Sequence, residues 1–148
     1  MFKHILLPTD GSKLSDKAVK SGIAFAKSIK ARVTSIHVVP EFGMMMDEGF
    51  VAPMSAELKQ RYEKESRENA QKILDKVARL AGAAGVGHDA VIVNSDVPYQ
   101  QIIDTATKRK CDLILMASHG RRGLSSLLLG SETAKVLTHS KVPVLVVR

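Results

Sequence analysis

Asp112-Leu-Ile-Leu-Met-Ala-Ser-His-Gly120 is the stretch of sequence that decides the fold. Its apolar part, residues 112–117, is short and nearly continuous, as a strand buried on both faces would be, and small polar residues follow it at once. Gly130-Ser-Glu-Thr133 then opens a predicted helix over 131–139, and Val142-Pro-Val-Leu-Val-Val147 is a second apolar strand. A strand, a helix and another strand in this order predict a parallel βαβ unit.

The rest of the chain shows the same alternation. Further strands are predicted over 4–9, 32–39 and 89–94. Helices with a 3.6-residue apolar period are predicted in three places: after Ser15, with Ser12 or Ser15 as the cap; from Ser55 to the stopping glycines Gly82 and Gly85; and from Pro98 onward. Residues 40–54 read as an irregular connection. Five apolar strands separated by four helices predict an α/β fold, in which a doubly wound parallel sheet carries helices on both faces.

Bulk composition is that of a soluble globular protein. A length of 148 residues suits one domain, 1–148, and 45% hydrophobic with 25% charged residues is an ordinary balance. A lone cysteine, Cys111, excludes an internal disulfide, which fits a reducing compartment, and its position before a buried strand favours a structural thiol. No signal-peptide pattern or membrane-length apolar run is present, so we expect a cytoplasmic protein that contacts no membrane.

The net charge is +7, from 22 Lys and Arg against 15 Asp and Glu. Such an excess can mark a nucleic-acid-binding protein. Here the basic residues are scattered along the sequence in small groups such as Arg121-Arg122, and aromatic residues, at 4%, are too few to form stacking platforms. These observations favour a solvated basic surface over a nucleic-acid site.

Two loops are candidates for a ligand site. In a doubly wound sheet, ligands bind beyond the carboxyl ends of the strands, where strand order reverses. Pro8-Thr9-Asp10-Gly11-Ser12 follows the first strand, and residues 118–130 follow the fourth. Gly120 and Gly130 allow close approach of a phosphate, and the helix that starts near Ser131 offers unpaired N–H groups. The alternative is that Gly130 merely starts this helix and Ser131 caps it.

Both ends of the chain resemble the universal stress protein family. The resemblance rests on Ile-Leu-Leu-Pro-Thr-Asp-Gly-Ser at 5–12 and on residues 112–148, and it spans essentially the whole chain. It implies the strand order 3-2-1-4-5 and a nucleotide-binding regulatory role in stress response. ATP-binding members carry G-x2-G-x9-G-[ST], which matches here at Gly120, Gly130 and Ser131, with Ala117 in place of the first glycine.

This resemblance implies a site for ATP with Mg²⁺. The residues it points to are Pro8, Thr9, Asp10, Val39, Met116, Ala117, His119, Gly120, Gly130, Ser131, Glu132 and Thr133. Asp10 would orient the ribose or a phosphate-bound Mg²⁺, unless it only caps the first helix. His119 would donate to a phosphate, unless it only makes local hydrogen bonds.

Alternative functions remain open at this point. A fast phosphoryl-transfer enzyme is disfavoured because no G-x4-GK-[ST] string is present, although slow ATP hydrolysis remains possible. Ala117 keeps open a family member that binds no ATP and acts as an interaction module. The last strand, 142–147, lies at a sheet edge by resemblance, so we expect a homodimer in which Val144 and Val146 pair across a two-fold axis.

Overall fold

The computed structural model describes residues 1–42, 55–120 and 129–148. Most of the connection expected over 40–54, and the pair Arg121-Arg122, therefore lie outside the described residues. The elements along the chain are β1 His4–Pro8, α1 Lys13–Ile29, β2 Arg32–Val39, α2 Ala56–Ala84, β3 His88–Asn94, α3 Pro98–Lys108, β4 Leu113–Ala117, α4 Ser131–His139 and β5 Val144–Val147.

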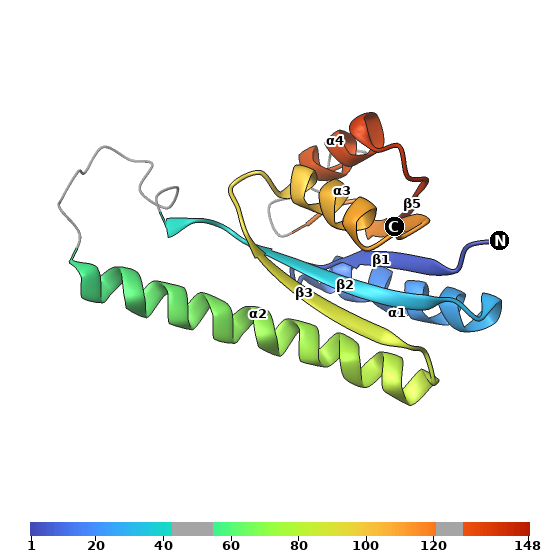
Figure 1. The fold of residues 1–148 in the computed structure, drawn as a ribbon, viewed down its shortest axis with the longest axis horizontal. Coiled ribbons are helices and arrows are strands. Elements are labelled where there is room, and N and C mark those ends of the chain that lie inside the picture. Colours follow the sequence, from blue (N-terminus) through green and yellow to red (C-terminus); the bar gives the residue numbers. More distant parts are fainter. Residues whose placement is uncertain (43–54, 121–128) are drawn as a thin grey trace.

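The five strands form one parallel sheet in the order β3-β2-β1-β4-β5 (Figure 1). The helices α1 and α2 cover one face, and α3 and α4 cover the other. This arrangement confirms the predicted doubly wound α/β fold and its strand order. Strand order reverses at β1, between β2 and β4, so the loops that follow β1 and β4 leave the same edge of the sheet side by side.

Several predicted boundaries differ from the structure by one or two residues, and three of these differences have a local cause. Gly82 does not stop α2, because the helix continues to Ala84 and ends at Gly85, whose φ of 70° is the left-handed conformation that glycine favours. Ser131 does not cap α4, because the cap position is Gly130. The last strand pairs from Val144 rather than from 142, since Pro143 has no N–H to donate to the ladder; its carbonyl still accepts from Ile114 N at 2.9 Å.

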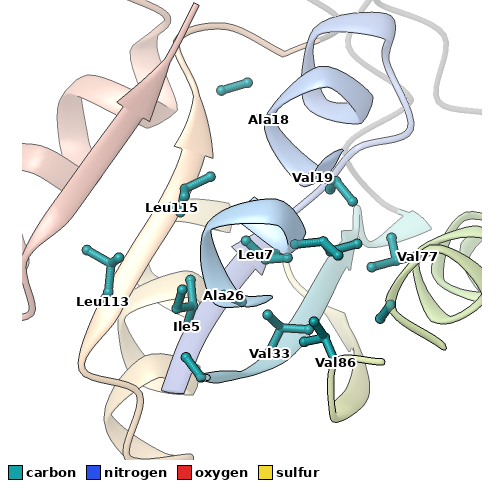
Figure 2. Close-up of a cluster of buried hydrophobic side chains, with 14 residues drawn as sticks. Ile5, Leu7, Ala18, Val19, Ala26, Val33, Val77, Val86, Leu113 and Leu115 are labelled. Carbon is teal, nitrogen blue, oxygen red and sulfur yellow. The ribbon is translucent and has the colours of Figure 1, made fainter. Parts of the chain in front are cut away.

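One half of the core lies between the sheet and the helices α1 and α2. Figure 2 shows aliphatic side chains from the strands and from both helices meeting in this layer. Packing is closest at Gly22 in α1, where an added Cβ would lie 2.5 Å from Leu7 Cδ2. A glycine at this position lets α1 lie directly against β1, and β1 leads into the first candidate loop.

Only the second half of α2 packs on the sheet. Its buried residues are Ala70, Leu74, Val77 and Ala81. The amino-terminal end of α2 extends beyond the sheet (Figure 1). Ion pairs one turn apart stabilise the exposed half, among them Arg61 Nε to Glu65 Oε1 at 2.8 Å.

Candidate nucleotide site at the carboxyl edge of the sheet

The loop after β1 is held by hydrogen bonds between neighbouring residues. Ser12 caps α1 by accepting from Ser15 N at 3.2 Å, and the Asp10 Oδ1 atom accepts from Ser12 N at 2.9 Å. Thr9 is buried, and its hydroxyl lies 3.2 Å from that of Ser15. The structure therefore assigns the cap of α1 to Ser12 rather than to Asp10 or Ser15, and Asp10 closes the turn that leads into the helix.

The loop after β4 is joined to the first turn of α4. Gly130 N donates to Ser118 O at 2.7 Å, and the Thr133 hydroxyl donates to Ala117 O at 3.0 Å. A Cβ on Gly130 would lie 3.3 Å from both His119 Cα and Ser118 O. The chain's own packing therefore leaves little room for a side chain at 130, whether or not a ligand binds.

The two loops meet at Gly120. A Cβ there would lie 2.5 Å from the Asp10 Oδ2 atom, so the Asp10 carboxylate rests against the backbone of the second loop. Neither Gly120 nor Gly130 has a positive φ. Glycine at 120 and 130 therefore provides space for neighbouring atoms, and neither residue adopts a backbone conformation that other residues would avoid.

Among the described residues, no side chain caps the amino end of α4. Ser12 caps α1 and Ser55 caps α2 through their hydroxyl oxygens, whereas Gly130 at the same position of α4 offers no side-chain acceptor. The N–H groups at the start of a helix have no intrahelical partners, and the helix dipole makes that end positive. Ser131, the first residue of α4, is exposed. An anion placed here would supply the missing acceptor.

Glu132 joins α4 to α3. Its Oε2 accepts from Tyr99 N at 2.8 Å, and its Oε1 lies 3.0 Å from Lys135 Nζ. The α3 helix begins after Val97, which has no capping side chain, so an acceptor from another helix takes that role. Sequence analysis missed this link; the available signal was a predicted helix that starts at Val-Pro and has no cap of its own.

His119 has one ring nitrogen in use. Its Nδ1 lies 3.1 Å from Ser118 Oγ, while its Nε2 is buried and has no hydrogen-bond partner among the residues described. Buried polar atoms are normally paired, so an unpaired one at a loop of this kind is notable. The local hydrogen bond expected for His119 is therefore present.

The remaining candidate residues are placed less directly. Val39 ends β2 and is buried, and its carbonyl accepts from Ser95 N at 2.9 Å. Met116 is buried in the core on the α3 and α4 face, so only its backbone is left for a ligand. Pro8, at the end of β1, is half-buried.

Within 1–42, 55–120 and 129–148, no group of three or more His, Cys, Asp or Glu side chains is arranged to hold a metal ion. Within the same ranges, no helix is long and apolar enough to span a membrane.

Comparison with known proteins agrees with this architecture. The model of the universal stress protein family matches residues 1–148. The chain belongs to the universal stress protein family. The universal stress protein MJ0531 of Methanocaldococcus jannaschii is 37% identical over 148 residues, which are all of this chain and 83% of that protein.

Solved structures of universal stress proteins share the fold. The structure of MJ0577, from the same organism, has a TM-score of 0.83 at 31% identity and covers 99% of this chain and 96% of its own. A universal stress protein in complex with cAMP has a TM-score of 0.71 at 24% identity, and the match covers 99% of this chain and 97% of that one.

As a universal stress protein, this chain departs from the ATP-binding motif at Ala117. Ala117 ends β4 and is buried, and its φ is not positive. Alanine therefore costs nothing in backbone conformation at this position. The only remaining difference from glycine is the volume of one methyl group.

Proposed function

We propose that this universal stress protein binds ATP with Mg²⁺ at the carboxyl edge of its sheet and acts as a nucleotide-dependent regulator. The observation that carries the proposal is the amino end of α4 at Gly130 and Ser131, which no described side chain caps, beside the His119 Nε2 atom, which has no partner among the described residues. The β- and γ-phosphates would bind the N–H groups of the first turn and the Ser131 hydroxyl. Binding of cAMP by a protein of the same fold supports an adenine nucleotide as the ligand.

The other candidate residues have narrower roles in this proposal. Asp10, resting on Gly120, would contact either the ribose hydroxyls or a Mg²⁺ ion carried by the phosphates. Val39 and Met116 would contribute backbone. Glu132 and Thr133 are engaged in protein contacts, so we assign them to positioning α4. We assign no catalytic residue, and any ATP hydrolysis would be slow.

A substitution at Ser131 tests the phosphate position without unfolding α4. Proline is well tolerated at the first position of a helix, and Gly130, with φ −69° and ψ 155°, already has the extended conformation that precedes proline. Ser131→Pro removes both the hydroxyl and one N–H, whereas Ser131→Ala removes only the hydroxyl. Calorimetry should show a loss of ATP affinity of about tenfold or more for Ser131→Pro and a smaller loss for Ser131→Ala, since each charged hydrogen bond contributes about 1.5–3 kcal/mol.

Matched variants complete this experiment. Ala56→Pro makes the same change at the first position of α2, outside the candidate site, and should leave ATP affinity unchanged. Ala117→Gly restores the family motif and should leave affinity equal or higher. Unchanged ATP affinity in Ser131→Pro would show that the phosphates do not bind at the amino end of α4, and it would refute the proposed site.

The second candidate function is an interaction module that binds no nucleotide. The methyl group of Ala117, where ATP-binding relatives have glycine, is the observation that favours it. Mass spectrometry of small molecules released from the denatured protein separates the two functions. Co-purified ATP supports the first; calorimetry with no heat from ATP and Mg²⁺ supports the second.

We also propose a homodimer formed through β5. The strand pairs with β4 on one side only, and Leu145 within it is 43% exposed. An edge strand of this kind exposes unpaired backbone groups and invites pairing with a copy of itself. Antiparallel pairing about a two-fold axis would place Val144 and Val146 near their symmetry mates.

A further inference from the structure

Eight of the 22 basic side chains of this protein lie at the amino ends of the strands, where few acidic side chains accompany them. We define the amino-edge face as the turns and strand ends at this edge, together with the last turns of α1 and α3. Its basic side chains are Lys3, Lys27, Lys30, Arg32, Lys108, Arg109, Lys110 and Lys141, and all eight are exposed. Its acidic side chains are Asp89 and Asp112, which leaves a net charge of +6 out of +7 for the whole chain.

Backbone hydrogen bonds bring these residues side by side. Arg32 N donates to Lys3 O at 3.0 Å, and Asp112 N donates to His4 O at 2.9 Å, so the amino ends of β2, β1 and β4 are adjacent. Ile114 N donates to Pro143 O, which places the segment after Lys141 beside β4. Strands are spaced by about 4.8 Å, so the face is about 14 Å wide from β2 to β5. This edge lies at the right of Figure 1, where the chain begins and α1 turns into β2.

The two acidic groups on the face are already engaged. The carboxylate of Asp112 accepts from the backbone N–H groups of Lys3 and His4, at 2.8 and 3.0 Å. Asp89 Oδ2 lies 3.8 Å from Arg109 Nη1. Seven of the eight basic side chains therefore have no acidic partner on this face.

Helix dipoles explain only part of this clustering. Lys27 and Lys108 lie in the last turns of α1 and α3, where a cation interacts favourably with the helix dipole. Lys3, Arg32 and Lys141 belong to no helix. The surplus of charge therefore exceeds what helix ends require.

Two of the lysines occupy positions that favour glycine. Lys30 and Lys110 have φ values of 58° and 55°, and no other non-glycine residue among those described has a positive φ. The corresponding end of α2 uses Gly85. Side chains other than glycine and asparagine are disfavoured in this conformation, so lysine is retained here against the backbone preference.

The face also has a depression that suits a phosphate. A hollow of about 290 Å³ is lined by Lys27, Lys30 and Arg32 together with Gly85, Val86 and Gly87. Of the large apolar side chains exposed in the described ranges, only Met1 belongs to this face. Stable protein interfaces have an apolar centre, and stable anchoring to a bilayer usually adds inserted apolar residues to the charge, so the surface suits a hydrophilic polyanion better.

We infer that the amino-edge face binds the phosphate backbone of double-stranded nucleic acid, independently of sequence and at the edge opposite the proposed nucleotide site. A duplex carries one negative charge per 1.7 Å of its axis, so the roughly 14 Å that the face covers holds about eight phosphates. Lysine is a flexible point charge that suits such contacts, and the face presents no helix that could read base edges. Single strands are disfavoured because the face has no exposed aromatic side chain on which bases could stack.

The double variant Lys30→Gly/Lys110→Gly tests this inference. Glycine relieves both left-handed positions, so the variant should melt at a higher temperature than the unmodified protein while binding duplex DNA more weakly. Fluorescence anisotropy with a labelled random-sequence duplex should show at least about a tenfold loss at 50 mM salt. With four to six phosphates contacted, the plot of log K against log salt should have a slope of roughly −3.5 to −5.5 for the unmodified protein, and the variant should lose about two units of slope.

The matched control is Lys59→Gln/Lys64→Gln on the exposed half of α2. This variant also removes two positive charges, but at positions outside the amino-edge face. Its affinity for the duplex should stay within about twofold of that of the unmodified protein. A control that loses as much affinity as the face variant would overturn the inference, because total charge would then explain the binding. So would tighter binding to a single strand than to the duplex, or stronger competition from polyglutamate or anionic vesicles at equal charge. Ser131→Pro should leave duplex binding unchanged, so this test does not depend on the proposed nucleotide site.

Discussion

Replacing Gly22 with alanine should destabilise the protein, although alanine is the better helix former. The new Cβ would lie 2.5 Å from Leu7 Cδ2 and 3.2 Å from Leu115 Cδ2. Both leucines are fully buried, so neither can move into free space. Overpacking of this kind costs about 1–3 kcal/mol. The gain in helix propensity is about 0.5–1 kcal/mol, so the net loss in free energy of unfolding should be up to about 2.5 kcal/mol.

Gly82→Ala is the matched control for this experiment. It also lies within a helix, but a Cβ there meets nothing within 4 Å, so it should stabilise the protein by about 0.5–1 kcal/mol. Urea unfolding followed by circular dichroism measures both variants and their m-values. The difference between them isolates the contact of α1 with the sheet. Equal stabilities for the two variants would refute the close packing of α1 on β1.

Three other predictions follow from burial and topology. Burial raises the pKa of the Cys111 thiol to about 11, so alkylation at pH 8 should be slow in the native protein and fast after denaturation. Burial, and then the nearby Arg32, lowers the pKa of His4, whose Nδ1 accepts from Arg32 Nη2 at 3.1 Å. The stability contributed by this neutral ring is present above about pH 6.5 and is lost as the pH falls. His4→Gln should therefore lose less free energy of unfolding between pH 7 and pH 5 than the unmodified protein loses. Equal losses in the two proteins would contradict this prediction. Val144→Lys should convert the proposed dimer to monomer by placing like charges across the axis, and light scattering that finds the unmodified protein monomeric at micromolar concentration would exclude that dimer.

Element types and their order were predictable because each depends on local periodicity. Buried strands are short apolar runs and helices show a 3.6-residue stripe, so the nine elements could be placed from the sequence. Boundaries were less predictable where two local preferences compete. Gly82 and Gly85 were both expected to stop α2, but only Gly85 does, since the helix continues through Gly82 and ends where Gly85 adopts a positive φ.

The candidate loops were also predictable, but the roles of several side chains within them were not. The loops after β1 and β4 lie at one edge of the sheet because both follow parallel strands, and this follows from topology alone. The contacts of Glu132 with Tyr99 N and of Asp10 with Gly120 join segments 33 and 110 residues apart. No short-range pattern encodes such contacts.

The distribution of charge shows most clearly what the sequence determines and what it does not. The sequence alone determined the net charge of +7, the family and the order of strands and helices, because these depend on composition and on local pattern. It showed the basic residues only as scattered small groups. The parallel fold decided where they lie: every crossover returns the chain to the same edge of the sheet, so Lys3, Lys30, Arg32, Lys110 and Lys141 meet on one face although up to 138 residues separate them.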